Sequence, residues 1–256
     1  MKYIKKLLNL KFLIIIYFLY GFYLTANLFI DQQEIDYLVP YTVTTLGSFA
    51  TIIFAPITEE IIYRYWAYGK NIQLQFSLFI TFLLFISVDF YQNFIHDFLN
   101  ITKDSDINGM FRHTLVILIG LIIYYFIKKY NFTIPSFFSK LTKSTFVYLS
   151  IIFLFAITHL YKKELNYDNL FSYIDFFIAS YLLTRHAKDY GIFYAILLHI
   201  AMNAAIIFDQ ARTVQLAAKN LVSDQLLFTY FLIAVFFVSF YFIQFMKAKP
   251  LKLNQR

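Results

Sequence analysis

The chain has 256 residues, of which 60% are hydrophobic and 14% are charged, and its formal net charge is +7. This composition leaves too little polar surface to coat a soluble globule, which excludes an ordinary soluble enzyme. Cysteine is absent, which excludes a disulfide framework, a thiolate zinc site and a cysteine nucleophile. Apolar runs recur at lengths near the ~20 residues that a bilayer-spanning helix needs. The composition therefore predicts an all-α, polytopic membrane protein in contact with the lipid bilayer, with no nucleic-acid partner.

The apolar runs predict about eight transmembrane helices. The first follows four lysines; it is long for a secretory signal and has no convincing cleavage site, so we interpret it as a retained span. The sixth is short, and a re-entrant or tilted segment is the alternative there. The predicted spans cover residues 12–30, 41–68, 74–95, 113–127, 145–160, 171–184, 190–208 and 226–246.

The distribution of basic residues predicts the orientation of these spans. With the N-terminus inside, fifteen of the 22 lysines and arginines fall in inner segments and six in outer loops. This asymmetry favours cytoplasmic N- and C-termini. Glycine and proline are scarce, at 6 and 4 residues, and no linker or repeat is visible, so residues 1–256 are predicted to form a single membrane domain. Residue usage favours a bacterial cytoplasmic membrane, and the oligomeric state is left open.

Three charged residues lie inside the second predicted span, in the segment Ala55-Pro56-Ile57-Thr58-Glu59-Glu60-Ile61-Ile62-Tyr63-Arg64. Ionisable side chains at membrane depth are costly and mark functional sites by default. Glu60 and Arg64 are i,i+4 neighbours on a helix and are predicted to pair. Glu59 is rotated by about 100° from Glu60 and remains available for another role. Pro56 is expected to kink or loosen the helix. The alternative is a purely structural ion pair with a spare carboxylate.

Two further polar motifs lie on downstream spans. Phe155 precedes His159 by one turn near the end of the fifth span, and His199 precedes Asn203 by one turn inside the seventh. A water-facing interfacial histidine and an interhelical polar clamp are the structural alternatives. Together these groups resemble a hydrolytic set, in which glutamate acts as a general base or joins the histidines around a zinc ion. Imidazole and amide N–H groups can stabilise an oxyanion.

The sequence Glu-Glu-x-x-x-Arg, followed by Phe-x-x-x-His and then His-x-x-x-Asn, resembles the CPBP intramembrane proteases. This family comprises the CAAX prenyl endopeptidases and the bacteriocin-processing (Abi) proteins, and the resemblance covers about residues 50–208. It implies an intramembrane endopeptidase that cleaves a peptide or protein substrate. In such an enzyme Glu59 and His159 would activate water, Glu60 and Arg64 would complete the first motif, and His199 and Asn203 would form the oxyanion site. If the enzyme is metal-dependent, Glu59, His159 and His199 would hold zinc; no cofactor is otherwise implied.

The spacing between the first two motifs is unusually long for this family. Glu59 and His159 are 100 residues apart in the sequence, with the third and fourth predicted spans between them. An extra pair of spans preserves helix direction, so the two motif helices can still be antiparallel neighbours. Within the intervening segment we interpret His96 and His113 as loop histidines. Asp89 in the third span and Asp175 in the sixth are interpreted as structural or cavity-lining.

Two other functions are compatible with the sequence. One is a non-catalytic membrane scaffold or bacteriocin self-immunity protein, which would keep the fold and use the polar cluster as a clamp. The other is a small transporter, for which intramembrane charges are also expected. A transporter sequence is expected to show inverted-repeat symmetry between its two halves, and this sequence shows none. We therefore expect a protease whose polar side chains converge on one buried site.

Overall fold

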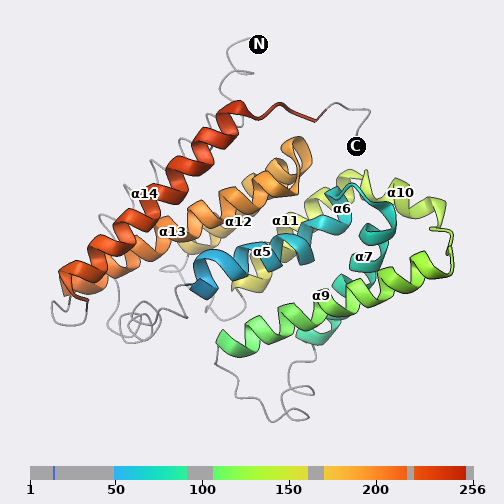
Figure 1. The fold of residues 1–256 in the computed structure, drawn as a ribbon, viewed down its shortest axis with the longest axis horizontal. Helices are drawn as coiled ribbons and strands as arrows, with labels where there is room; N and C mark the ends of the chain where they lie inside the picture. The colour runs from blue at the N-terminus through green and yellow to red at the C-terminus, as the bar shows by residue number, and fades with distance from the viewer. Residues whose placement is uncertain (1–13, 15–48, 91–105, 161–169, 218–221, 252–256) are drawn as a thin grey trace. The chain divides into compact units, whose positions relative to one another are not determined.

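A computed structural model describes residues 14, 49–90, 106–160, 170–217 and 222–251 (Figure 1). All regular structure within these residues is helical, which confirms the all-α prediction. Apart from Ile14, the predicted first span lies outside the described residues, as does His96.

Two of the described helices are long and apolar enough to cross a membrane, namely α13 (Ile192–Ala217) and α14 (Asp224–Lys247). A third candidate is the pair α10 (Ser136–Thr142) and α11 (Thr145–Leu160), which is bent by 63° at the break between them. Large apolar side chains project outward from these helices; Phe146 on α11 is 75% exposed and Phe236 on α14 is 60% exposed. Such surfaces suit contact with lipid. The protein is therefore an integral membrane protein with at least two candidate spans among its described residues.

Several predicted spans differ from the observed helices. The fourth corresponds to α9 (Asp106–Lys129) and the sixth to α12 (Leu170–Tyr190), and both helices extend into charged sequence that lowers their apolar character. The third corresponds to α7 (Ile72–Phe90), whose apolar stretch, Ile72–Ile86, is short for a span. The segment between the fourth and fifth predicted spans, residues 128–144, is expected to be a basic loop, but it contains the helix α10. The count of eight spans therefore stays a prediction.

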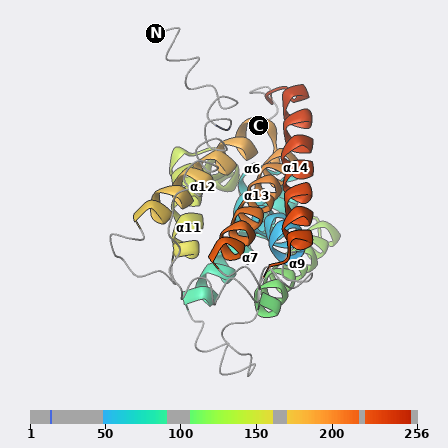
Figure 2. The same cartoon turned by 90° about the vertical axis from the view of Figure 1, so that its left-hand side faces the viewer.

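The described chain divides into two compact units. One consists of the described parts of Met1–Pro56 together with Ile196–Ala248, and the other of Ile57–Ala195 with the residues after Ala248. In the second unit α7 packs along α9 and α11 packs along α12 (Figures 1 and 2). A third contact in this unit joins α6 (Trp66–Tyr68) to α7.

Aromatic side chains fill the core of this second unit. The Trp66 ring lies 5.0 Å from Phe79 and 5.2 Å from Phe82 between ring centroids. Phe79 in turn contacts Phe138 of α10 at 5.3 Å. Aromatic pairs at such distances contribute beyond the area that they bury. This core joins the predicted second span, α7 and the short helix α10 into one body.

Gly191 forms the junction between α12 and α13. Its φ is +101°, in the left-handed region that glycine adopts without the steric cost other residues pay. The Gly191 N–H donates to the Ala187 carbonyl at 3.0 Å, closing the last turn of α12. Beside this junction the Leu251 N–H donates to the Asp189 carbonyl at 2.8 Å, so the described end of the chain is attached here.

Candidate functional site

The charged motif lies on one helical segment that alternates between two hydrogen-bonding patterns. It consists of η1 (Ala50–Phe54), α5 (Ala55–Glu60), η2 (Ile61–Tyr65) and α6, where η1 and η2 are π-helical. The Ala55 N–H donates to the Ala50 carbonyl, five residues back. Pro56 has no N–H to continue the ordinary i→i−4 ladder, which is consistent with the irregular turn before it. Pi-helical turns are rare and occur often at functional sites.

Glu60 and Arg64 form the ion pair that their spacing predicts. Arg64 Nη1 donates to Glu60 Oε1 at 2.6 Å, and both side chains are fully buried. This distance is short for a charge-assisted hydrogen bond. A lone buried charge would be costly, so each group depends on the other for its place in the apolar interior.

Arg64 also connects the motif helix to two other helices of the same unit. Its Nε donates to Thr184 Oγ1 of α12 at 3.1 Å. Its guanidinium carbon lies 4.3 Å from the centre of the Phe155 ring on α11, a cation–π contact in a desolvated setting. Arg64 therefore fixes the positions of α11 and α12 relative to the motif helix, as well as neutralising Glu60.

Glu59 and His159 meet across the second unit despite their sequence separation. Glu59 Oε2 lies 3.5 Å from His159 Nε2, and the side chains are 13% and 28% exposed, respectively. The long insertion does not separate them, because α7 and α9 pack beside the motif helix instead of between it and α11. The pair is therefore partly buried and still accessible.

The contact between His159 and the Phe155 carbonyl determines which ring nitrogen of His159 carries a hydrogen. His159 Nδ1 lies 2.8 Å from the Phe155 carbonyl oxygen, which can only accept, so Nδ1 donates. In the neutral imidazole Nε2 is then an acceptor, and it faces the acceptor oxygen of Glu59. Two acceptors at this separation require a proton between them or a bridging donor such as water.

Phe155, one turn before His159, contacts both of the first two motifs through its backbone carbonyl and its ring. Its carbonyl orients the His159 ring, and the two rings lie 4.3 Å apart between centroids. The Arg64 guanidinium also lies over the Phe155 ring. Tyr63 adds a further bridge, since its hydroxyl donates to Thr158 Oγ1 at 2.9 Å. The first two motifs thus form one contact network.

His113 is not a loop histidine, which corrects the sequence-based interpretation. It lies on α9, where its Nδ1 is 3.1 Å from Thr58 Oγ1, and its ring is 5.6 Å from Phe85 of α7. Thr58 immediately precedes Glu59 and is 5% exposed. Sequence reasoning missed this contact because His113 lacks the phenylalanine of the second motif and adjoins polar sequence. The α7–α9 insertion thereby provides an imidazole beside the motif helix.

We expect the Thr58–His113 hydrogen bond to be measurable as a coupling energy. Thr58→Val and His113→Phe should each lower the free energy of unfolding, and the double variant should lose about 1 kcal/mol less than the sum of the two. Unfolding in mixed detergent micelles, followed by the fluorescence of Trp66, provides the measurement. Thr58→Val combined with Ser180→Ala is the control, because Ser180 donates to the Ile152 carbonyl instead and should be additive. Additivity of Thr58→Val and His113→Phe would contradict the contact.

His199 and Asn203 lie on α13 in the first unit. His199 is 6% exposed, and Asn203 Nδ2 donates to the Thr51 carbonyl of η1 at 2.8 Å. This bond attaches α13 to the start of the motif helix within the first unit. The amide nitrogen carries two N–H groups, so one N–H remains beyond the bond to Thr51. The structure therefore describes Glu59, Glu60, Arg64 and His159 as one cluster in the second unit, and the His199–Asn203 pair in the first.

The zinc alternative requires Glu59 and His159 of the second unit together with His199 of the first. Glu59 and His159 are two adjacent donors, and among the described residues no group of three or more histidine or carboxylate side chains gathers to hold a metal ion. Structural and catalytic zinc sites use at least three protein ligands. We therefore derive no step through a metal.

Asp89 and Asp175 are the two single carboxylates predicted on the third and sixth spans. Asp89 falls near the end of α7, and Asp175 is exposed on α12. The interpretation of both residues as structural or cavity-lining stays a prediction.

The described residues define an all-helical integral membrane protein with a buried ion pair in its second unit. Residues 41–138 match the family model described as "Type II CAAX prenyl endopeptidase Rce1-like". This match confirms the resemblance to the CAAX proteases. It covers less than half of the chain, includes Glu59, Glu60 and Arg64, and ends before His159, His199 and Asn203. No curated protein and no solved structure matches the chain.

Proposed function

We propose that this protein is an intramembrane endopeptidase of the CAAX-protease type, in which Glu59 and His159 activate a water molecule. The observation that carries the proposal is the 3.5 Å approach of Glu59 Oε2 to His159 Nε2 beside the buried Glu60–Arg64 pair. The family match supplies the reaction class, since the matching model describes endopeptidases.

The geometry of this pair suits a bridging water. Glu59 Oε2 and His159 Nε2 are both acceptors when the pair is deprotonated, so one water can donate a hydrogen to each at the ~2.6–3.2 Å of a direct hydrogen bond. The water's lone pairs are then directed away from both groups, toward a substrate carbonyl. A water-mediated base of this kind contributes about 10²–10⁴-fold to the rate.

The reaction proceeds in two steps. The water oxygen attacks the scissile carbonyl carbon while its proton passes to the Glu59–His159 pair, giving a tetrahedral oxyanion. Collapse of this species breaks the C–N bond, and the same proton passes to the leaving amine. The immediate products are a carboxylic acid and an amine, the acid's proton then passes to the amine, and the Glu59–His159 pair returns to its initial protonation state.

His199 and Asn203 are proposed to stabilise the oxyanion. The second amide N–H of Asn203 supports this role, as does the burial of His199 on the same helix. Donors held rigidly in a water-poor setting stabilise developing charge strongly.

The proposed substrate is a peptide or protein whose cleavage site lies at the membrane, in the bacterial cytoplasmic membrane. The name of the matching family points to prenylated C-terminal Cys-aliphatic-aliphatic-X sequences as the first substrate class to examine. The matching model names this type and not the bacteriocin-processing proteins, and no observation favours the scaffold or immunity alternative.

Cleavage of a defined peptide tests this proposal. The full chain, reconstituted in proteoliposomes, is incubated with a farnesylated peptide ending in a CAAX sequence and with the same peptide lacking the farnesyl chain. We expect mass spectrometry to show release of the C-terminal residues from the farnesylated peptide at a higher rate. Cleavage of neither peptide, by a chain shown to be folded, would contradict a CAAX-type activity.

A further inference from the structure

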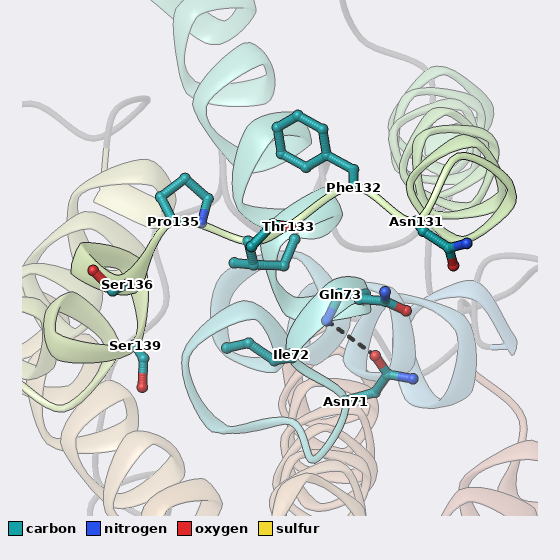
Figure 3. A pocket seen from close by; sticks show the side chains of 10 residues that line it. Asn71, Ile72, Gln73, Asn131, Phe132, Thr133, Pro135, Ser136 and Ser139 are labelled. Atoms are coloured by element: carbon teal, nitrogen blue, oxygen red, sulfur yellow. Dashed lines mark hydrogen bonds between the residues drawn. The ribbon is translucent and has the colours of Figure 1, made fainter.

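An open cleft of about 640 Å³ lies in the second unit, at the end where the α6–α7 turn meets the segment between α9 and α10, and both polar and apolar residues line it. Figure 3 shows Ser136 and Ser139 on one side of this cleft, Asn131 on the other, and Asn71 with Gln73 between them. Thr133 also lines it. Ligand sites commonly have volumes of ~300–1,000 Å³, so the cleft is large enough for a small headgroup. Its hydroxyls and amide N–H groups are hydrogen-bond donors.

The chain around this cleft is cationic. Lys70, Lys129 and Lys140 adjoin or nearly adjoin lining residues in the sequence, and all three are exposed. Lys128 and Lys143 belong to the same segments and are exposed as well. No aspartate or glutamate occurs between Glu60 and Asp89, or between Asp106 and Glu164. A bound anion would therefore meet donors and positive charges without a competing carboxylate from these segments.

Three exposed aromatic residues line the cleft or adjoin its lining residues in the sequence. Tyr130 is 69% exposed, Phe132 is 53% exposed and Phe137 is 59% exposed. The Lys129 ammonium lies 5.6 Å from the centre of the Tyr130 ring. Aromatic and basic side chains together are typical of the membrane–water interface, where rings reach the headgroup level. The short helix α10 turns by 63° from α11 beside the cleft, as expected of a segment that lies along this interface.

We propose that this cleft binds the phosphodiester headgroup of an anionic phospholipid. Lysine clusters next to membrane helices attract anionic lipids. Here the clustered charge coincides with a lined cleft and an aromatic rim, which together favour a lipid over a soluble phosphate. The lipid would bridge the α6–α7 turn and α10, and so hold α10 against the aromatic core. This inference does not rest on the proposed peptidase activity.

Binding of short-chain lipids to the purified full chain in detergent tests the proposal. We expect dioctanoyl phosphatidylglycerol to bind at least tenfold more tightly than dioctanoyl phosphatidylcholine or glycerol 3-phosphate. Ser136→Ala with Ser139→Ala should weaken phosphatidylglycerol binding about fivefold or more, since two donors are lost. Lys129→Gln with Lys140→Gln should weaken it by about 10- to 30-fold.

The matched control is Lys247→Gln with Lys249→Gln, which removes the same charge from two exposed lysines, one at the end of α14 and one just after it. We expect this control to change binding less than threefold. If both pairs of lysine substitutions weaken phosphatidylglycerol binding equally, the lipid is attracted by the general positive charge and the proposed site is wrong. If glycerol 3-phosphate binds as tightly as phosphatidylglycerol, the ligand is a soluble phosphate and not a lipid. If phosphatidylcholine binds as tightly as phosphatidylglycerol, the cleft does not select for negative charge, and the proposal is wrong. The fluorescence of Trp66, the single tryptophan, reports whether each variant remains folded.

Discussion

Glu59→Gln should lower the rate of peptide hydrolysis by about 10²–10⁴-fold, because the amide cannot accept the proton of the attacking water. Gln is nearly isosteric with Glu, and the carboxylate is 13% exposed, so the fold should be retained. Initial rates on the farnesylated peptide, measured with saturating substrate, provide the test. The loss should appear in the turnover number and not mainly in KM, because the missing interaction belongs to the transition state.

Asp175→Asn is the matched control for Glu59→Gln. It neutralises an exposed carboxylate of α12 in the same unit and should leave the hydrolysis rate within about threefold, since solvent screens an exposed charge. Retention of full activity by Glu59→Gln would assign the hydrolysis to other groups. A comparable loss from Asp175→Asn would point to a general charge effect instead of general-base chemistry.

Arg64→Met should cause the largest loss of stability among single substitutions in this unit. Glu60 would remain fully buried without its partner, and breaking a buried ion pair costs about 3–5 kcal/mol. The contacts of Arg64 with Thr184 and Phe155 would be lost as well. The free energy of unfolding in mixed micelles, followed by Trp66 fluorescence, measures this loss.

A second arginine offers a matched comparison at the same i,i+4 spacing. Arg185 pairs with Asp189 at 2.7 Å, but its side chain is 40% exposed. Arg185→Met should therefore cost only about 0–1 kcal/mol. The double variant Glu60→Leu with Arg64→Met should recover much of the single-variant loss, because no buried charge remains. Equal losses from Arg64→Met and Arg185→Met would contradict the account of the buried pair.

Local features of the fold and the site are accessible from the sequence. The Glu60–Arg64 pair follows from helical periodicity, because residues four apart share a face. The all-α, membrane-embedded class follows from composition, because so few charged residues cannot cover a soluble surface. The family resemblance rests on the same short motifs, and the match to residues 41–138 confirms it.

Long-range contacts are not accessible in the same way. No periodicity links Glu59 to His159 across 100 residues; the approach depends on where the α7–α9 pair packs. The bond between His113 and Thr58 is hidden for the same reason, since tertiary packing alone brings α9 to the motif helix. The basic segment before the fifth span reads as a loop, yet α10 forms there because Phe138 inserts between Phe76 and Phe79 of α7.

The central claim is that Glu59 and His159 act as one unit on one water molecule, and a double-variant cycle tests it most directly. His159→Asn keeps a donor for the Phe155 carbonyl and removes Nε2, and Glu59→Gln removes the carboxylate. We predict that the double variant hydrolyses the farnesylated peptide no more slowly than the slower single variant, because groups that act together are strongly non-additive. Rate losses that multiply across the two substitutions would show independent roles and contradict the shared water.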